Sequence, residues 1–301
     1  MRSQLSFTFP YEPHKPFPKN IWQTWKVGLD DKTFPKRFQY YQESWDEQNP
    51  GYKHYVVPDA EANEMIASLY KTVPDVARAY SIMPKSILQA DFFRYLILYA
   101  RGGVYSDIDT WGLKPVSTWV SANDTLNNKP SNPGVVVGIE ADPDRPDWND
   151  WYARRIQFCQ WTIQAKPGHP LLRELIARIT ELTLERDANG KLSETLGKDE
   201  SGDIMDWTGP GIFTDYVFKY LNNILQPSAN FESKNYEKVI DWEFFTGIQS
   251  PMLIDDVMVL PITSFSPDVG QMGAGSSHDA LAYVKHMFQG SWKTDGTGEQ
   301  I

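Results

Sequence analysis

A helix that is apolar on every side limits how this chain can fold. The pattern between Lys85 and Arg101 predicts one long helix, and its apolar residues cover nearly the whole circumference. They are Ile87, Leu88, Phe92, Phe93, Leu96, Ile97 and Leu98. Such a helix has to be buried by other elements. Arg101-Gly102-Gly103 ends it and leads into a short β-rich run, Val104 to Ser106.

Two charged residues, Asp91 and Arg94, interrupt this apolar helix. Because they are three residues apart they share one face, and burying either charge is costly unless it has a partner. One interpretation is a mutual ion pair that only stabilises the fold. The other is a polar face turned toward a charged ligand. The helix alone favours the ion pair, and it leaves both interpretations open.

Two carboxylates, Asp107 and Asp109, follow the short strand. With the two-residue period of a strand, both point to one side and Ile108 points to the core. Neighbouring carboxylates repel, and a hard divalent cation relieves that repulsion while it leaves positions for phosphate oxygens. The D-x-D triplet alone is weak support, because the chain holds a second one, Asp142-Pro143-Asp144, which we interpret as an exposed turn.

The rest of the chain alternates between strand-like and helical runs, which predicts an α/β fold with a mixed or mostly parallel sheet. Further predicted strands are Asn20–Trp25, Tyr52–Val57, Val135–Ile139 and Val257–Leu260. Further predicted helices are Phe34–Trp45, Asp59–Lys71, Pro74–Tyr80, Leu171–Glu185 and Gly211–Leu221. Asp187 to Asp206 is rich in glycine and charge, so we expect a surface excursion there. No linker divides the chain, which indicates one compact domain.

Composition narrows the classes of function. The chain has 301 residues and a formal net charge of -10, so a nucleic-acid partner is not expected, because binding the phosphate backbone needs a clustered cationic surface. A nucleotide diphosphate remains compatible, since a bound cation can supply positive charge locally. Cys159 is the only cysteine, which excludes an internal disulfide. No apolar run has the length of a membrane span, so this chain is expected to be soluble.

Around the acid pair the sequence resembles the signature of glycosyltransferase family 32. The similarity is carried by ADFFRYLILY at residues 90–99 and GGVYSDID at residues 102–109. It extends over most of the chain, to FPKNIWQTW at 17–25, WTGPG at 207–211 and HMFQGSWK at 286–293. The resemblance implies a GT-A (Rossmann-like) fold, with a mixed central sheet flanked by helices. We expect an extended lead-in over residues 1–18, a single catalytic domain over 19–294 and a frayed tail over 295–301.

The resemblance also implies roles for four residues, which form the predicted catalytic set. Asp109 would bind a manganese-type divalent metal directly. Asp107 would lie near the ribose and donor sugar, and we assign it to the metal as well. Asp91 and Arg94 would hold the donor sugar and its phosphate, which gives the polar face of the buried helix a use. The implied reaction retains the configuration at the transferred sugar.

Further candidates lie toward the C-terminus. His286 could supply a third metal ligand, although a lone histidine is more often structural. Just beyond it, we predict a loop that closes over the donor diphosphate, and its cationic residue would offset the charge of the leaving group. The residues assigned to that loop are Ser291, Trp292 and Lys293.

Three other residues are assigned to the donor. Gly209 and Gly211 precede a helix, where glycine lets the backbone approach a sugar and the helix N-terminus offers amide donors. The alternative is an ordinary helix-entry turn. Trp22, in the first predicted strand, is predicted to lie beside the nucleotide base.

Within the family, WQTWK at residues 22–26 and GSWK at 290–293 are most similar to the α-1,6-mannosyltransferases of the fungal Golgi. This similarity implies transfer of mannose from GDP-mannose, in α-1,6 linkage, onto the mannose core of a high-mannose N-glycan. It also implies a Golgi-lumenal location, through a membrane anchor that this chain does not contain. The glycosylation sequon Asn123-Asp124-Thr125 suits that location. No feature of the sequence indicates recognition of guanine, so a UDP-sugar donor remains an alternative.

Two other classes of function remain compatible with the residues. One is a glycoside hydrolase that uses two carboxylates and needs neither metal nor nucleotide. The other is a non-catalytic carbohydrate-binding module, which the 11 tryptophans and the aromatic content of 14% would suit. Metal-linked binding of a nucleotide diphosphate would distinguish the transferase from both.

Overall fold

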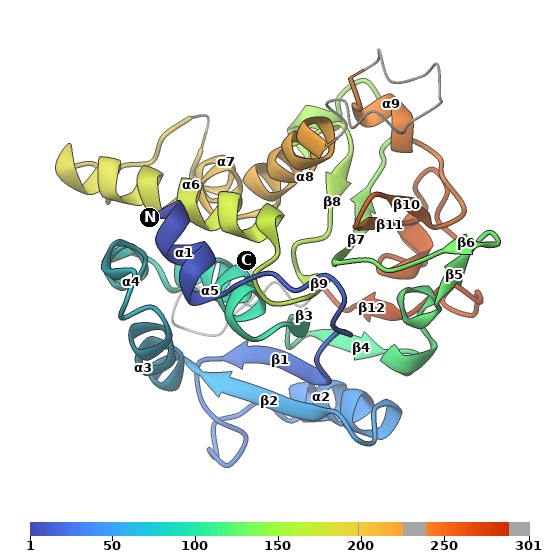
Figure 1. The fold of residues 1–301 in the computed structure, drawn as a ribbon, viewed down its shortest axis with the longest axis horizontal. Helices are drawn as coiled ribbons and strands as arrows, with labels where there is room; N and C mark the ends of the chain where they lie inside the picture. The colour runs from blue at the N-terminus through green and yellow to red at the C-terminus, as the bar shows by residue number, and fades with distance from the viewer. Residues whose placement is uncertain (198, 225–238, 289–301) are drawn as a thin grey trace.

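The structure is a computed structural model that describes residues 1–197, 199–224 and 239–288. Its centre is an eight-stranded sheet (Figure 1). The strands are β1 (Asn20–Trp25), β2 (Lys53–Pro58), β3 (Gly103–Ser106), β7 (Val135–Ala141), β8 (Gln157–Phe158), β9 (Thr162–Ala165), β10 (Met252–Ile254) and β11 (Val257–Leu260). Their order is β10-β11-β7-β9-β3-β1-β2, and β8 pairs with β7.

The sheet is mixed. β1 pairs in parallel with β2 and with β3, and β11 pairs in parallel with β7. β9 lies between these two groups and is antiparallel to both β3 and β7. The predicted α/β fold with a mixed central sheet is therefore confirmed.

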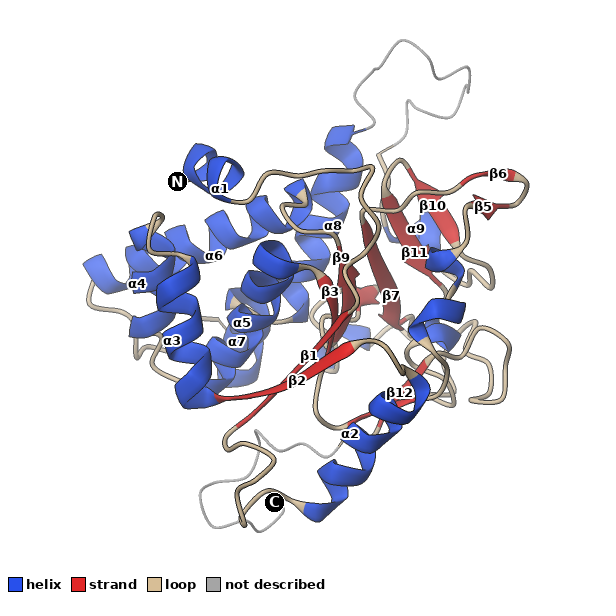
Figure 2. Ribbon diagram, turned by 60° about the horizontal axis from the view of Figure 1, so that its bottom comes forward, coloured by secondary structure: helices blue, strands red, loops and turns tan. Residues whose placement is uncertain are grey.

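Helices flank this sheet, and Figure 2 shows α3 to α7 gathered on one side of it while α2 lies on the other. The helices are α1 (Arg2–Thr8), α2 (Lys36–Gln48), α3 (Asp59–Leu69), α4 (Pro74–Ile82), α5 (Ser86–Arg101), α6 (Pro170–Ala188), α7 (Glu200–Trp207), α8 (Pro210–Ile224) and α9 (Trp242–Phe245). Two small antiparallel ladders complete the fold, β4 (Thr110–Gly112) with β12 (Val284–His286) and β5 (Thr125–Leu126) with β6 (Lys129–Pro130).

The core has two layers because the central strands are apolar on both faces. Along β7, Val135 and Val137 belong to the helix-side cluster, whereas Val136 belongs to the cluster on the opposite face. The predicted buried helix is α5, and every residue from Asp91 to Ala100 in it is buried. Its apolar circumference is covered by neighbouring helices and by the sheet, as the pattern required.

The N-terminal prediction needs a correction. Residues 2–8 are not extended, because they form α1, whose Leu5 is fully buried. Arg2 holds this helix to α6 through ion pairs with Glu174 and Glu181. Burial of Leu5 therefore orders a segment that the proline-rich run after it made look unstructured, and the partly exposed ion pairs add little. The predicted frayed tail, 295–301, lies outside the described residues.

The predicted surface excursion at residues 187–206 is also wrong in part, because α7 begins at Glu200. Asp203 on this helix is buried and accepts hydrogen bonds of 3.0 and 2.5 Å from Arg186 at the end of α6. This pairing of charged residues across two helices is invisible to local composition. None of the helices in the described ranges is long and apolar enough to cross a membrane.

Candidate active site

A tight connection between α5 and β3 positions the acid pair. Gly102 and Gly103 both have positive φ, 64° and 104°. A Cβ at Gly103 would overlap the carbonyl oxygen of Asn20, so glycine is needed for β3 to lie this close to the start of β1. Trp22 Nε1 donates a hydrogen bond of 3.0 Å to the Gly102 carbonyl. These contacts fix the position of β3 relative to β1 directly after the buried helix ends.

Asp107 and Asp109 lie in the turn between β3 and β4, not on a strand. The predicted two-residue alternation is therefore wrong as the reason for their convergence. The turn is closed by hydrogen bonds from the Thr110 backbone N–H, over 3.2 Å, and from its Oγ1, over 2.6 Å, to the Asp107 carbonyl. The Asp107 N–H donates in turn to the Trp161 carbonyl. Backbone hydrogen bonds thus fix a compact acidic turn.

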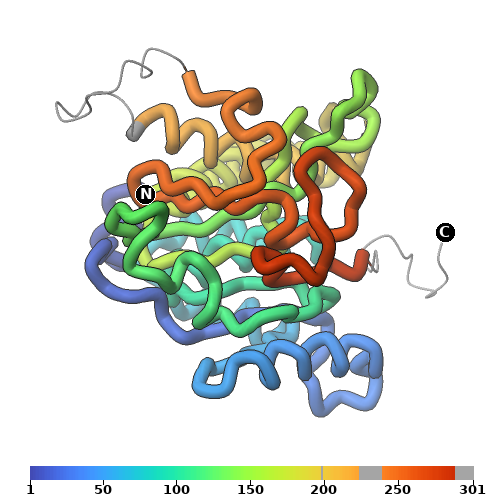
Figure 3. Tube along the Cα trace, turned by 90° about the vertical axis from the view of Figure 1, so that its right-hand side faces the viewer, coloured from blue at the N-terminus to red at the C-terminus, as the bar shows by residue number. Residues whose placement is uncertain are grey.

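His286 reaches this turn through the β4–β12 ladder, in which it pairs with Thr110. Figure 3 shows the red C-terminal segment lying along the green segment that carries β4. His286 Nε2 lies 3.5 Å from Asp109 Oδ1. One ligand atom each from Asp107, Asp109 and His286 lie within 4.8 Å of one another. The structure thus brings together the three residues assigned to the metal.

Arg94 connects the buried helix to the same turn. Its Nη2 lies 2.8 Å from Asp91 Oδ1 and 3.3 Å from Asp107 Oδ1. Gln160 bridges the helical pair, accepting from Arg94 Nη1 and donating to Asp91 Oδ1 over 3.2 Å. Thr208 Oγ1 donates to Asp91 Oδ2. The ion-pair interpretation is confirmed, and the contact of Asp91 and Arg94 with a donor stays a prediction.

The electrostatics of the site favour a bound cation. Burial raises the pKa of Asp107, and the neighbouring Asp109 carboxylate adds to that effect, while Arg94 opposes it. Burial disfavours the charged form of Arg94, but the Asp107 and Asp91 carboxylates outweigh it and raise the pKa of Arg94. Arg94 thus stays charged and offsets one carboxylate, leaving the turn with surplus negative charge.

The residues present fit a divalent metal of the manganese type. Two carboxylates and one imidazole are ligands that such ions accept, and they leave positions for phosphate oxygens. One adjustment is needed at His286, because Phe288 N–H donates to its Nδ1 over 2.8 Å, which places the proton on Nε2 in the neutral ring. Coordination through Nε2 requires the other tautomer and the loss of that hydrogen bond.

Glu140 is a site residue that the sequence analysis missed. It lies at the carboxyl end of β7, where its Oε1 accepts from Trp161 Nε1 over 3.2 Å and its Oε2 accepts from Gln157 Nε2 over 2.9 Å. Burial raises its pKa, and its charge interacts with His286 and Asp107. A carboxylate directly after the apolar run Val135 to Ile139 was a usable signal, because ligands bind at the carboxyl ends of such strands.

Some residues predicted to bind the donor also have packing roles. Trp22 is buried and stacks on Tyr55 with ring centroids 4.3 Å apart, and its place beside a nucleotide base stays a prediction. A Cβ at Gly209 would lie 2.8 Å from Met205 Cα, and one at Gly211 would lie 2.9 Å from the Met205 carbonyl oxygen. These glycines let α7 turn tightly into α8, which favours the helix-entry alternative.

The residues assigned to the closing loop, Ser291, Trp292 and Lys293, lie outside the described residues, so their roles stay predictions. The second D-x-D triplet can be placed. Asp142 is only 1% exposed, and it accepts hydrogen bonds from Arg155 and from the backbone N–H of Gly247. The predicted exposed turn is therefore wrong for Asp142, whereas Asp144 is exposed.

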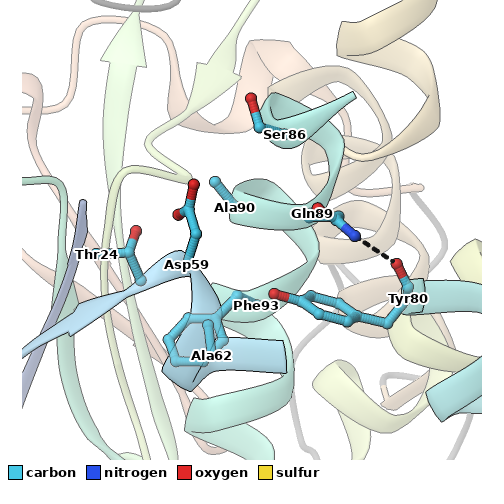
Figure 4. A pocket seen from close by; sticks show the side chains of 8 residues that line it. All are labelled: Thr24, Asp59, Ala62, Tyr80, Ser86, Gln89, Ala90 and Phe93. Atoms are coloured by element: carbon cyan, nitrogen blue, oxygen red, sulfur yellow. Dashed lines mark hydrogen bonds between the residues drawn. The ribbon is translucent and has the colours of Figure 1, made fainter. Parts of the chain in front are cut away.

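A small pocket lies between β1, α3, α4 and α5 (Figure 4). Its inner wall is apolar and buried, formed by Ala62, Tyr80 and Phe93, while Thr24 and Asp59 lie toward its mouth. Other residues lining it are Ser86, Gln89 and Ala90. Thr24 Oγ1 lies 3.2 Å from the Tyr105 hydroxyl, which donates to Asp107 Oδ1 over 3.0 Å. Two hydrogen bonds thus link the pocket to the acid pair.

Comparison with known proteins decides the family. Residues 35–127 match the family described as glycosyltransferase sugar-binding region containing DXD motif. The chain is 66% identical to the initiation-specific alpha-1,6-mannosyltransferase of Candida albicans, over 99% of this chain and 78% of that protein. It is 44% identical to the protein of the same name from Saccharomyces cerevisiae, over 98% of this chain and 82% of that protein. The chain belongs to glycosyltransferase family 32.

Membership of family 32 makes the chain a glycosyltransferase, and the hydrolase and non-catalytic alternatives are set aside. The mixed sheet flanked by helices is the GT-A architecture that the resemblance implied. Among solved structures, the chain is similar to the PaToxG glycosyltransferase, with a TM-score of 0.46 and 16% identity over 75% of this chain and 76% of that one.

Proposed function

We propose that this family 32 enzyme transfers mannose from GDP-mannose, in α-1,6 linkage, to the mannose core of a high-mannose N-glycan. The observation that carries the proposal is the convergence of Asp107, Asp109 and His286, joined by Arg94 to the buried helix. The linkage and the sugar are supported by the names of the relatives at 66% and 44% identity, both alpha-1,6-mannosyltransferases. A Golgi-lumenal location and an N-glycan acceptor complete the proposal.

A divalent metal, manganese in this proposal, would be held by Asp107, Asp109 and His286. When bound, it supplies positive charge that stabilises the departing diphosphate. Arg94 supplies a second, permanent positive charge, and its Nη2 lies 3.3 Å from Asp107 Oδ1. Glu140, held by Trp161, places a further carboxylate within electrostatic reach of His286 and Asp107, and its negative charge would suit a sugar that becomes positive at its anomeric carbon.

The proposed transfer balances without a further reactant. The bond between the anomeric carbon and the diphosphate oxygen breaks, and its electron pair leaves with GDP. The 6-hydroxyl oxygen of the acceptor mannose forms the new bond at the same carbon, and its proton passes to the departing phosphate. Attack on the face that the diphosphate leaves retains the anomeric configuration, and this route needs no enzyme nucleophile. The side chains orient the donor and neutralise charge.

Asp59, at the mouth of the pocket in Figure 4, supports guanine as the donor base. The pocket itself, about 10 Å³, has room for no more than about one water, so the base would lie outside it. Burial raises the pKa of the Asp59 carboxylate and the charge of Lys26 opposes that effect, but no hydrogen bond to this carboxylate is present in the described part of the chain. Guanine presents two adjacent donors, N1–H and N2–H, and a carboxylate can accept both. Uracil presents one N–H between two carbonyl oxygens, which a carboxylate repels. A base lying across this mouth would stand next to α5, whose Asp91 and Arg94 are assigned to the donor.

The test compares Asp109→Ala with Asp30→Ala, a control at an exposed acid outside the site. The wild type and the control should transfer mannose from GDP-mannose to a high-mannose glycan, as shown by mass and linkage analysis. Asp109→Ala should be inactive yet folded, and its GDP binding should no longer strengthen with manganese in calorimetry. Full activity of that variant, or of the wild type in chelator, would overturn the metal-dependent proposal. If the enzyme consumed only a UDP-sugar, the proposal that GDP-mannose is its donor would be wrong.

A further inference from the structure

A second hollow lies beyond the carboxyl end of β7, away from the acidic turn. It has a volume of about 450 Å³, which is in the range of small-ligand sites. Its lining residues are Asp144, Arg145, Pro146, Trp148, Arg155 and Trp242. We propose that this outer hollow binds a sugar unit of the oligosaccharide acceptor, remote from the hydroxyl that reacts. The inference rests on the proposed function, because it assumes a mannose-rich acceptor.

The outer hollow is built on a buried carboxylate. Asp142 accepts from Arg155 Nη1 over 2.8 Å, from Thr246 Oγ1 over 2.9 Å and from the Gly247 N–H over 2.7 Å. Thr246 and Gly247 directly follow α9, so Asp142 fixes both the arginine and the helix that carries Trp242. The Arg155 guanidinium lies 4.6 Å from the centre of the Trp242 ring. One wall of the hollow is thus rigidly placed before any ligand binds.

The charges of the outer hollow favour a neutral ligand. Arg155 is paired with Asp142, and Arg145 is paired with Asp147 through two contacts of 2.5 Å. Asp144 adds a carboxylate for which no pairing cation is present in the described residues. No surplus positive charge remains to hold a phosphate or a carboxylate.

The chemistry of the walls suits a pyranose. Arg155 lies over one face of the Trp242 ring, but this side chain remains 38% exposed, and Trp148 lines the same hollow, so indole surface is available to the C–H face of a sugar. Arg145, Arg155 and Asp144 stand beside these rings, where guanidinium N–H groups can donate to hydroxyls and a carboxylate can accept from them. Aromatic surface beside paired charges therefore suits a ligand that is uncharged and rich in hydroxyl groups.

The outer hollow and the active site are linked through residues at the end of β7. Glu140 lies near the end of β7 and Asp142 directly follows that strand, so the backbone positions of the two carboxylates are at most about 7 Å apart. Glu140 binds Trp161, whose ring centroid is 4.7 Å from that of His286. In Figure 1, α9 stands beyond the end of the sheet next to β10 and β11. An oligosaccharide that reacts beside His286 can therefore extend toward Trp242.

The test measures transfer to two acceptors, a methyl mannoside and a high-mannose oligosaccharide. In Trp242→Ala the KM for the oligosaccharide should rise about tenfold, as the loss of an aromatic anchor predicts. Its kcat, its KM for the mannoside and its hydrolysis of donor without acceptor should stay unchanged. Trp242→Phe should restore most of the affinity, and Trp148→Ala should act in the same direction.

Phe244→Ala is the matched control, because Phe244 is 48% exposed on the same helix and does not line the hollow. An equal rise in KM for both acceptors, or no rise in either tryptophan variant, would overturn the inference. If the wild type transfers no mannose, the proposed function fails instead. Calorimetric titration of the oligosaccharide into wild type and Trp242→Ala then still decides whether the hollow binds it.

Discussion

Arg94 Nη2 lies within 3.3 Å of both Asp91 Oδ1 on α5 and Asp107 Oδ1 in the acidic turn. One guanidinium therefore joins the most buried helix of the fold to the metal-binding candidates. Because Asp91 and Arg94 are each 2% exposed, neither charge can be solvated by water if its partner is removed. The stability of the core and the geometry of the site depend on the same side chain.

Replacing Arg94 should therefore destabilise the fold strongly. Arg94→Met removes the cation and leaves the buried Asp91 carboxylate without its charge partner, so the free energy of unfolding should fall by about 3–5 kcal/mol. Urea denaturation followed by circular dichroism measures this. Arg2→Ala is the control, because Arg2 makes ion pairs on the exposed surface and its loss should cost about 1 kcal/mol or less. If the free energy of unfolding fell equally in Arg94→Met and Arg2→Ala, Arg94 would contribute no more to stability than a surface ion pair.

His286→Ala should separate metal binding from folding. The variant removes one of three candidate ligands, and manganese-dependent GDP binding should weaken by at least about tenfold, measured by calorimetry. Its thermal unfolding should change little, since His286 lies on a short ladder at the edge of the core. His278→Ala, at an exposed histidine, should change neither property. Unaltered metal dependence in His286→Ala would limit the metal ligands to the carboxylates.

Asp59→Asn should reduce discrimination between GDP and UDP. The variant keeps the shape of the side chain but turns one acceptor into a donor, so it loses one of the two acceptors proposed for guanine. The ratio of the GDP and UDP dissociation constants should change by about tenfold or more against GDP. Asp75→Asn on the exposed surface of α4 is the control. If Asp59→Asn binds GDP and UDP more weakly by the same factor, Asp59 does not distinguish guanine from uracil.

Asp256 predicts a specific pH dependence of stability. Although burial opposes its charge, hydrogen bonds from His169, Tyr11 and Tyr220 lower its pKa below the ordinary 3.8. A lowered folded-state pKa stabilises the fold above the unfolded pKa and ceases to do so as the pH falls through the folded value.

Comparison of the wild type with Asp256→Asn measures this effect. The wild type should unfold at a higher temperature by an equal margin from pH 7 to pH 5, equivalent to about 1–3 kcal/mol. That margin should shrink only below about pH 4, where the Asp256 carboxylate of the unfolded chain begins to take up protons. A margin that shrinks between pH 7 and pH 5 would point to a group other than Asp256.

Local patterns predicted most of the elements. The strand Asn20–Trp25 has the predicted bounds, and the helix from Ser86 to Arg101 follows its apolar pattern within one residue of its predicted start. The acid pair and the Asp91–Arg94 pairing could also be predicted, because opposite charges three residues apart lie on one face of a helix. These features depend on neighbours within a turn or two of the chain.

Only the tertiary structure decided which distant segments meet. The β4–β12 ladder brings His286 to Asp109, the end of β7 brings Glu140 to Trp161, and the buried Asp142 holds Arg155 and α9. Long-range strand pairing and buried polar contacts depend on how whole elements pack, and no periodicity in the sequence records that choice. The sequence by itself determined the buried helix and its acidic turn, and packing determined what surrounds them.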